Sequence, residues 1–155
     1  MTTMNNTLAK GVSDEHYTPE SIFTALRIQF DLDVAAPEGG SSVVPALYYF
    51  DKKADGLVNK WFGNVWMNPP YSSPAPWVEK FLIHRQGIAL LPITRGKWWD
   101  RLWVESDAIL PTAYNLKFNR PDGLTSKPIV FRTALYAIGE TNVTALKMSG
   151  LGQIR

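Results

Sequence analysis

Two kinds of hydrophobic spacing alternate along the chain. Apolar side chains recur every three or four positions in three segments, which predicts helices over residues 21–29, 77–85 and 98–104. Short continuous apolar or aromatic runs lie between and after them and are typical of buried strands. These runs cover residues 30–36, 48–50, 65–67, 88–92, 108–110, 113–118 and 129–138. The alternation predicts one α/β domain with a mostly parallel sheet and helices on both faces.

Local signals refine three boundaries. Thr18 has the features of an N-cap, with Pro19 at the first helical position. Gly63-Asn64 is expected to form a hairpin-like turn that leads into the strand at residue 65. Residues 65–91 read as strand, helix and strand, which predicts a βαβ crossover.

The sequence Met-Asn-Pro-Pro-Tyr-Ser at residues 67–72 begins where the run 65–67 ends. Two successive prolines cannot continue a sheet ladder, so the backbone must turn out of the sheet at Asn68. Open α/β sheets bind their ligands at the carboxyl ends of strands. We therefore expect the functional site at this loop.

The residue types in this loop suit the methylation of an amine. An exocyclic amino group on a nucleobase is a poor nucleophile, because its lone pair is delocalised into the ring. If the Asn68 side-chain carbonyl and the Pro69 main-chain carbonyl accept its two protons, the lone pair is freed to attack an electrophilic methyl group. Pro70 would hold the turn so that these dipoles are aimed in advance. Tyr71 offers a flat face for stacking on a base taken out of the duplex.

A second candidate segment lies upstream. The run 30–36 carries Asp33 and leads into a glycine-rich turn at residues 37–42. A strand, an acidic residue and a flexible turn in this order suit a nucleotide-like ligand, since the backbone comes close and the carboxylate can hold a cation or a hydroxyl. The alternative is that Asp33 caps a loop or a helix. Asp51 and Asp55 lie in a turn cluster and are open to the same alternative.

Composition limits the class of protein. The 155 residues are 45% hydrophobic, which fits one globular domain, and we expect residues 1–13 to form a flexible tail before a domain at 14–155. The chain has no cysteine and two histidines, so a metal-free mechanism is favoured. It contains no apolar run long enough to span a membrane and no signal-like start, which predicts a soluble cytoplasmic protein.

Charge is distributed unevenly. Residues 1–79 hold five Lys and Arg against nine Asp and Glu, whereas residues 80–155 hold eleven against five, so the halves carry −4 and +6. The second half is therefore expected to face phosphates, although a solvated basic surface without a partner is an equally ordinary explanation.

Five side chains are candidates for DNA contact. Arg95 and Lys97 follow the run 88–92 and could bind phosphates beside the base, and Trp98 could hold an extruded nucleotide. Tryptophan pairs are more often core residues, which is the alternative for Trp98. Arg120 and Lys127 lie in a polar loop over residues 119–127, which is the segment best suited to touch DNA.

Asn68-Pro69-Pro70-Tyr71 resembles the NPPY motif of amino-methyltransferases that use S-adenosylmethionine, and in particular the phage-type DNA N6-adenine methyltransferases. Further segments match this family in order: Tyr17–Glu20, Phe30–Ala36, Asp55–Leu57 with Trp61, and Leu90–Pro92. The resemblance covers most of residues 16–138. It implies a Rossmann-like methyltransferase fold in a minimal single domain, double-stranded DNA as the partner, and action in the cytoplasm of a bacterial host.

The resemblance also implies a cofactor site for S-adenosylmethionine. Its residues by correspondence are Tyr17, Thr18, Pro19, Asp33, Ala35, Ala36, Asp55 and Asn68. Asp55 would accept the amino group of the cofactor's adenine. The segment 30–36 lacks the FxGxG pattern common among methyltransferases and instead has the Asp-x-Ala-Ala form that is usual in the phage subgroup.

Other functions compete with this interpretation. A protein glutamine amide or an RNA base would suit the same loop chemistry, and a methyltransferase-like module without cofactor binding could merely mask DNA. Asparagine at position 68 favours adenine, because enzymes acting on cytosine N4 more usually begin the motif with serine. The interval from Asp33 to Asn68 and the tail after Tyr71 are too short for a separate target-recognition domain. We therefore expect loose or short-site recognition, or help from a protein partner or a homo-oligomer.

Overall fold

The computed structural model describes residues 18–113 and 132–155, which form a three-layer α/β structure. Six strands form one sheet in the order β2-β1-β3-β4-β6-β5. Their bounds are β1 Phe30–Asp33, β2 Ala46–Tyr49, β3 Val65–Met67, β4 Gly87–Pro92, β5 Ala108–Pro111 and β6 Thr133–Ile138. The helices are α2 Glu20–Leu26, α3 Ala75–His84, α4 Lys97–Glu105 and α5 Glu140–Met148. None of these helices is long and apolar enough to cross a membrane.

Several predictions fall outside the described residues. These are the tail at 1–13, the strand over most of 113–118, the start of the run 129–138, and the site residues Tyr17, Arg120 and Lys127.

The sheet is mixed. Strands β2, β1, β3 and β4 pair in parallel, whereas β6 runs antiparallel to both β4 and β5. The prediction of an α/β fold is confirmed, and the expectation of a mostly parallel sheet holds from β2 to β4 and ends at β6. The βαβ crossover is also confirmed, because α3 links the parallel neighbours β3 and β4.

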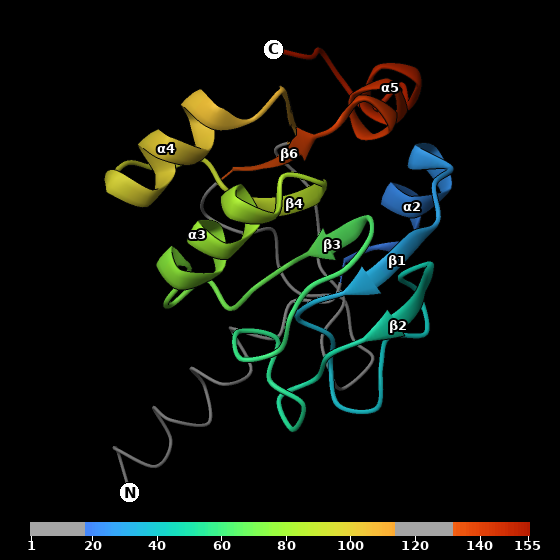
Figure 1. Ribbon diagram of the computed structural model, residues 1–155. Coiled ribbons are helices and arrows are strands. Elements are labelled where there is room, and N and C mark those ends of the chain that lie inside the picture. The colour runs from blue at the N-terminus through green and yellow to red at the C-terminus, as the bar shows by residue number, and fades with distance from the viewer. Residues whose placement is uncertain (1–17, 114–131) are drawn as a thin grey trace, which may run out of the picture.

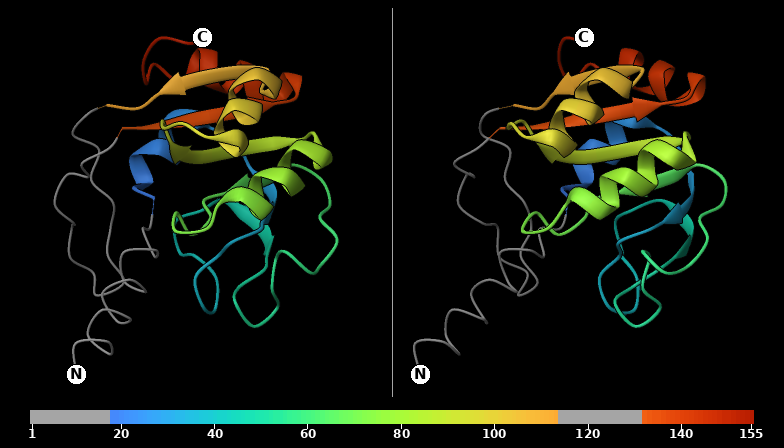
Figure 2. Two further views of the ribbon diagram at one scale, coloured as in Figure 1. Left: turned by 90° about the vertical axis from the view of Figure 1, so that its left-hand side faces the viewer. Right: turned by 60° about the vertical axis from the view of Figure 1, so that its left-hand side comes forward.

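Helices cover both faces of the sheet, as the hydrophobic spacing predicted. Figures 1 and 2 show α3 and α4 lying together on one face, with α2 and α5 on the other. Side chains along β4 alternate between the two layers: Ile88 and Leu90 pack with α2 and α5, while Ala89 and Leu91 pack with α3 and α4. Burial of each such leucine or isoleucine contributes about 1.5–3 kcal/mol.

The start of α2 differs from the prediction. Pro19 is the N-cap and no side chain caps the helix, so the assignment of Thr18 as N-cap is wrong. The Thr18 hydroxyl instead accepts a hydrogen bond from Asn68 Nδ2 at 3.1 Å. Arg27 takes a left-handed conformation with φ 51°, which ends the helix before residue 29.

Gly63-Asn64 does not form a hairpin, because the strand that follows is parallel to both of its neighbours. Gly63 has φ +65°, and a Cβ there would lie 2.3 Å from the Asp31 carboxylate. That carboxylate accepts the Asn64 backbone N–H at 2.7 Å. The Asn64 side chain forms a buried reciprocal amide pair with Asn142 of α5, at 2.9 and 2.7 Å.

The order of the strands creates a crevice. β1 has β2 on one side and β3 on the other, so the chain crosses to the opposite side of β1 between these two strands. Loops that leave the carboxyl ends of β1 and β3 diverge at such a switch point, which is where doubly wound sheets bind ligands.

Candidate active site

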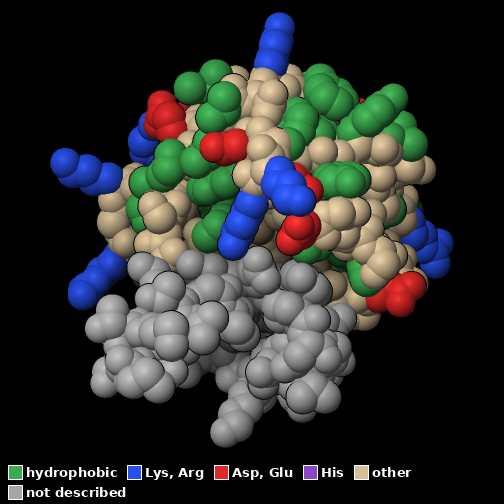
Figure 3. Space-filling view, turned by 90° about the horizontal axis from the view of Figure 1, so that it is seen from below, with side chains coloured by type: hydrophobic (Ala, Val, Ile, Leu, Met, Phe, Trp, Pro, Cys, Tyr) green, Lys and Arg blue, Asp and Glu red, His purple; other side chains and the backbone are tan. Residues whose placement is uncertain are grey.

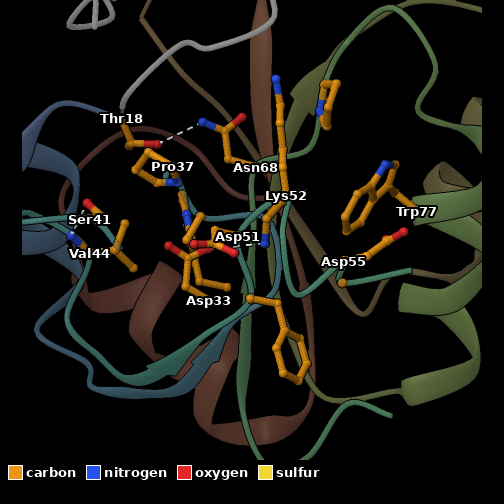
Figure 4. A pocket seen from close by; sticks show the side chains of 16 residues that line it. Thr18, Asp33, Pro37, Ser41, Val44, Asp51, Lys52, Asp55, Asn68 and Trp77 are labelled. Carbon is orange, nitrogen blue, oxygen red and sulfur yellow. Dashed lines mark hydrogen bonds between the residues drawn. The ribbon is translucent and has the colours of Figure 1, made fainter. Parts of the chain in front are cut away.

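A pocket of about 250 Å³ lies at this switch point. Residues after β1 and Thr18 form one wall, while residues 50–56 and α3 form the other (Figure 4). The lining residues are Thr18, Asp33, Ala35, Ala36, Pro37, Ser41, Val44, Phe50, Asp51, Lys52, Asp55, Gly56, Trp66, Asn68, Pro70 and Trp77. Segments far apart in the sequence are therefore brought to one cavity, including seven of the predicted site residues.

Asn68 is half-buried and directly follows β3, where the two prolines turn the backbone out of the sheet. Its Nδ2 donates to the Thr18 hydroxyl, so the carboxamide nitrogen faces Thr18 and the oxygen is turned the other way (Figure 4). Thr18 is itself 4% exposed, which makes it a fixed acceptor. The bond to Thr18 thus directs the amide nitrogen of Asn68 toward Thr18, which leaves the oxygen as the group of this amide that could act as the acceptor predicted from the sequence.

Asp33 is the most perturbed acid of the pocket. It is the last residue of β1 and is 3% exposed. Burial raises the pKa of its carboxyl group to about 7, against the opposing effect of the Ala35 backbone N–H, which lies 3.3 Å from Oδ1. The carboxyl group is therefore balanced between its neutral and charged forms near neutral pH.

Asp51 and Asp55 shape the loop after β2 and also line the pocket. The Asp51 carboxylate accepts the backbone N–H groups of Lys53 and Ala54, both at 3.1 Å, and of Gly39 at 3.3 Å. These bonds lower its pKa. Asp55 has a left-handed φ of 64°, and its Oδ1 accepts the Leu57 N–H at 3.0 Å. Both residues are therefore turn-formers whose side chains face a cavity.

Tyr71 is not among the lining residues. Its hydroxyl donates to the main-chain carbonyl of Leu90 in β4 at 3.0 Å, and its ring packs against the core on the α3 side. Burial raises its pKa above the usual value. Of the two prolines in the motif, Pro70 lines the pocket, whereas Pro69 is buried and does not line it. Pro19 is also absent from the lining.

The described candidates for DNA contact lie away from the cavity lining. Arg95 and Lys97 are exposed beyond the carboxyl end of β4, and Trp98 is half-buried against the core. Figure 3 views the molecule from below and shows Lys and Arg side chains both at the edges and near the centre of the view, with Asp and Glu side chains close to them. The charges on this part of the surface are thus mixed in sign.

Comparison with known proteins identifies the family. The family model for DNA N-6-adenine-methyltransferase (Dam) matches residues 5–111. The chain belongs to this family. A DNA N-6-adenine-methyltransferase of Haemophilus phage HP1 (strain HP1c1) is 32% identical over 111 residues, which are 64% of this chain and 62% of that protein. The chain thus spans less than two thirds of the length of this Dam relative. No solved structure matches the chain.

Eight lining residues of this Dam-family pocket were not among the sequence candidates, nor was Asp51, which was weighed as a turn-former. They are Pro37, Ser41, Val44, Phe50, Lys52, Gly56, Trp66 and Trp77. Two of them carried a usable signal. Gly56 belongs to the Asp-Gly-Leu segment that matched the family, and Trp77 begins the apolar stripe of α3 directly after the proline motif. The others depend on how the loops after β1 and β2 fold back, which no local spacing reveals.

Proposed function

We propose that this chain transfers the methyl group of S-adenosylmethionine to N6 of adenine in DNA. One observation carries the proposal: Asn68 projects from the carboxyl end of β3 into the same cavity as the buried Asp33, with its carboxamide fixed by Thr18. Membership of the Dam family supports the same activity.

The residues of the pocket fit the cofactor. It combines an adenine ring, ribose hydroxyl groups and positively charged sulfonium and ammonium groups, so it needs apolar surface together with acceptors. Val44, Phe50 and Trp77 supply the apolar surface. Asp33 and Asp55 supply carboxylates, and ionised carboxylates accept both hydroxyl and ammonium protons. We include Tyr17, Pro19, Ala35 and Ala36 in the cofactor site by their correspondence to the family.

The bound cofactor would supply an electrophilic methyl group on its sulfonium. The Asn68 Oδ1 and the Pro69 main-chain carbonyl would accept the two N–H protons of the target amine and so favour a tetrahedral nitrogen with a free lone pair. Because Thr18 already orients the amide, little reorganisation accompanies substrate binding. Pro70 holds the turn. The methylated ammonium product is acidic and loses its proton readily, so the site needs no strong general base.

Several finer assignments belong to the same proposal. The switch point and the layer arrangement support a Rossmann-like methyltransferase fold. Tyr71 would stack on the extruded adenine, and Arg95, Lys97, Trp98, Arg120 and Lys127 would contact double-stranded DNA. Target recognition would rest on short loops, a protein partner or a homo-oligomer. The site of action would be the cytoplasm of a bacterial host.

Transfer of labelled methyl from S-adenosylmethionine to unmethylated duplex DNA tests the proposal, with the product nucleosides identified. We expect N6-methyladenine from the wild type and a loss of about 100-fold or more in Asn68→Ala, the scale of removing a preorganised acceptor or donor. Ser73→Ala, at an exposed position just beyond the motif, is the matched control and should remain active.

Two other outcomes would replace the proposal. Cofactor binding without transfer to DNA would point to an amide or RNA substrate. No cofactor binding at all would indicate a DNA-masking module.

A further inference from the structure

The loop at residues 51–59 forms one wall of the pocket without any helix or strand of its own. It contributes Asp51, Lys52, Asp55 and Gly56 to the lining. Asp55 is held in a left-handed conformation, and its carbonyl accepts the backbone N–H groups of Val58 and Asn59 at 3.1 and 3.2 Å. Non-glycine residues in such conformations persist where surrounding contacts enforce them.

Gly56 is pressed between two other parts of the pocket. A Cβ at this position would lie 2.0 Å from the carbonyl oxygen of Val34, which directly follows β1, and 3.0 Å from the Trp77 ring of α3. No side chain fits in that space. The wall therefore depends on the glycine and on whatever holds this backbone against β1.

Lys80 of α3 holds this backbone in place. Its ammonium group donates to the main-chain carbonyls of Gly56 and Leu57, both at 3.0 Å, and to that of Asn59. An ammonium group has three N–H donors, and three carbonyls of one loop converge on it. Partial burial lowers the pKa of Lys80, against the opposing effect of the Asp55 carboxylate.

Trp61 completes the arrangement. Its indole Nε1 donates to the Gly56 carbonyl at 2.7 Å, and the Lys80 ammonium lies 5.3 Å from the centroid of its ring, within cation–π range. The Gly56 carbonyl thus accepts from both side chains. These contacts give a structural role to the Asp-Gly-Leu segment and to the tryptophan that follows it. Both matched the family, but neither takes part in the proposed polarisation of the target amine.

We propose that Lys80 is a positioning residue for the cofactor: its ammonium group gathers three carbonyls of loop 51–59 and holds Asp55 and Gly56 in the wall of the pocket. The inference rests on the proposed function of this pocket as the cofactor site. Trp77 lies one helical turn before Lys80 on α3, and α3 begins at Ala75, shortly after the motif that ends at Tyr71. One helix therefore sets both the cofactor wall and the end of the amine-binding loop.

Cofactor affinity in Lys80→Met tests the proposal. Methionine keeps most of the apolar stem and removes the three donors. We expect the Kd for S-adenosylmethionine, measured by calorimetry, to rise about tenfold, which is the scale of losing hydrogen bonds to a charged group. The KM for the cofactor should rise with little change in kcat. Lys147→Met, at an exposed position on α5, is the matched control and should bind as the wild type does.

Chemical rescue separates positioning from general stability. Lys80→Ala leaves room for a small cation between the carbonyls, so ethylammonium should restore cofactor affinity. Tetramethylammonium has the same charge but no N–H donors and should not restore it. Equal effects of the two ions would overturn the proposal.

The remaining outcomes are equally decisive. A wild-type chain that binds no cofactor refutes the proposed function, whereas a wild type that binds and a Lys80→Met that binds equally well refutes only this inference. If Lys80→Met is unfolded at the assay temperature, Lys80→Gln keeps a polar side chain and removes the ammonium group that binds the three carbonyls. Weaker cofactor binding in that variant supports the proposal, and unchanged binding overturns it.

Discussion

At the scale of single residues, the pocket is defined by two polar groups in unusual surroundings. Asp33 is a carboxyl group buried at the end of a strand with a backbone N–H donor at 3.3 Å, and Asn68 is a carboxamide whose nitrogen donates to the Thr18 hydroxyl. The sequence predicted both as site residues, Asn68 because it follows the run 65–67 and Asp33 because it lies in the run 30–36 before a glycine-rich turn and matches the family. It could not predict the bond between Asn68 and Thr18, because the two are fifty positions apart and Thr18 also suited a helix cap.

Asp33 makes the stability of the fold depend on pH. Its pKa rises from an ordinary value of 3.8 to about 7 in the folded state, so the charged form is the disfavoured one. Below about pH 4 Asp33 is protonated in both the folded and the unfolded state, so it does not lower the free energy of unfolding. Between pH 4 and 7 Asp33 is ionised in the unfolded chain but still protonated in the folded one, so the free energy of unfolding falls as pH rises. Above pH 7 Asp33 is ionised in both states, and the loss has reached its full value, on the order of 4 kcal/mol.

Asp33→Asn should remove this loss, since the amide stays neutral. Urea unfolding at pH 5 and pH 8 gives the free energy of unfolding of both chains. This free energy should fall from pH 5 to pH 8 more in the wild type than in the variant. The same pH dependence in both chains would mean that Asp33 ionises in the fold without cost.

Thr18 offers a second test at this scale. Thr18→Val keeps the shape of the side chain and removes the acceptor for Asn68 Nδ2, so the carboxamide loses its fixed orientation. We expect kcat for methyl transfer to fall about tenfold, while Thr18→Ser, which keeps a hydroxyl, stays close to the wild type. Equal activity of the valine and serine variants would show that Thr18 does not orient Asn68.

At the scale of elements, hydrophobic spacing predicted which segments become helices and strands, but not how the neighbouring residues join them. α3 and β4 appear close to their predicted bounds because their apolar side chains fill the two layers of the core. Gly63-Asn64 was misinterpreted as a hairpin because a turn signal is local, whereas the partner of β3 is set by the whole sheet. The Asn64 and Asn142 amide pair had no sequence signal, since it joins distant elements.

The hydrogen bond from Tyr71 to Leu90 ties the proline loop to β4 and is a contact between elements. Tyr71→Phe keeps the ring and leaves the Leu90 carbonyl without this donor. We expect a loss of about 1–3 kcal/mol in the free energy of unfolding, since a buried acceptor would lose its partner. Chemical denaturation measures the loss. If the phenylalanine variant is as stable as the wild type, the bond does not anchor the loop.

At the scale of the whole molecule, residues 34–64 are fully engaged in building the pocket and the edge of the sheet. They cross from β1 to β2, form β2, and return through loop 51–59 to β3. The described residues leave no part of this interval for a separate unit that reads a DNA sequence. The exposed basic residues Arg95 and Lys97 are suited to phosphates, which carry no sequence information directly.

We therefore expect this chain alone to methylate adenine in short or loosely defined sites. Incubating it with DNA of varied sequence and mapping N6-methyladenine at single-base resolution would reveal a short shared sequence around the methylated positions or none. Binding that depends mainly on phosphates should also weaken steeply as salt rises, because counterions are released when lysine and arginine neutralise the backbone. Strict methylation of a site of six or more base pairs would contradict this expectation. It would require base contacts from residues outside the described part of the chain or from a second copy, and the dependence of the methylation rate on protein concentration would distinguish these two sources.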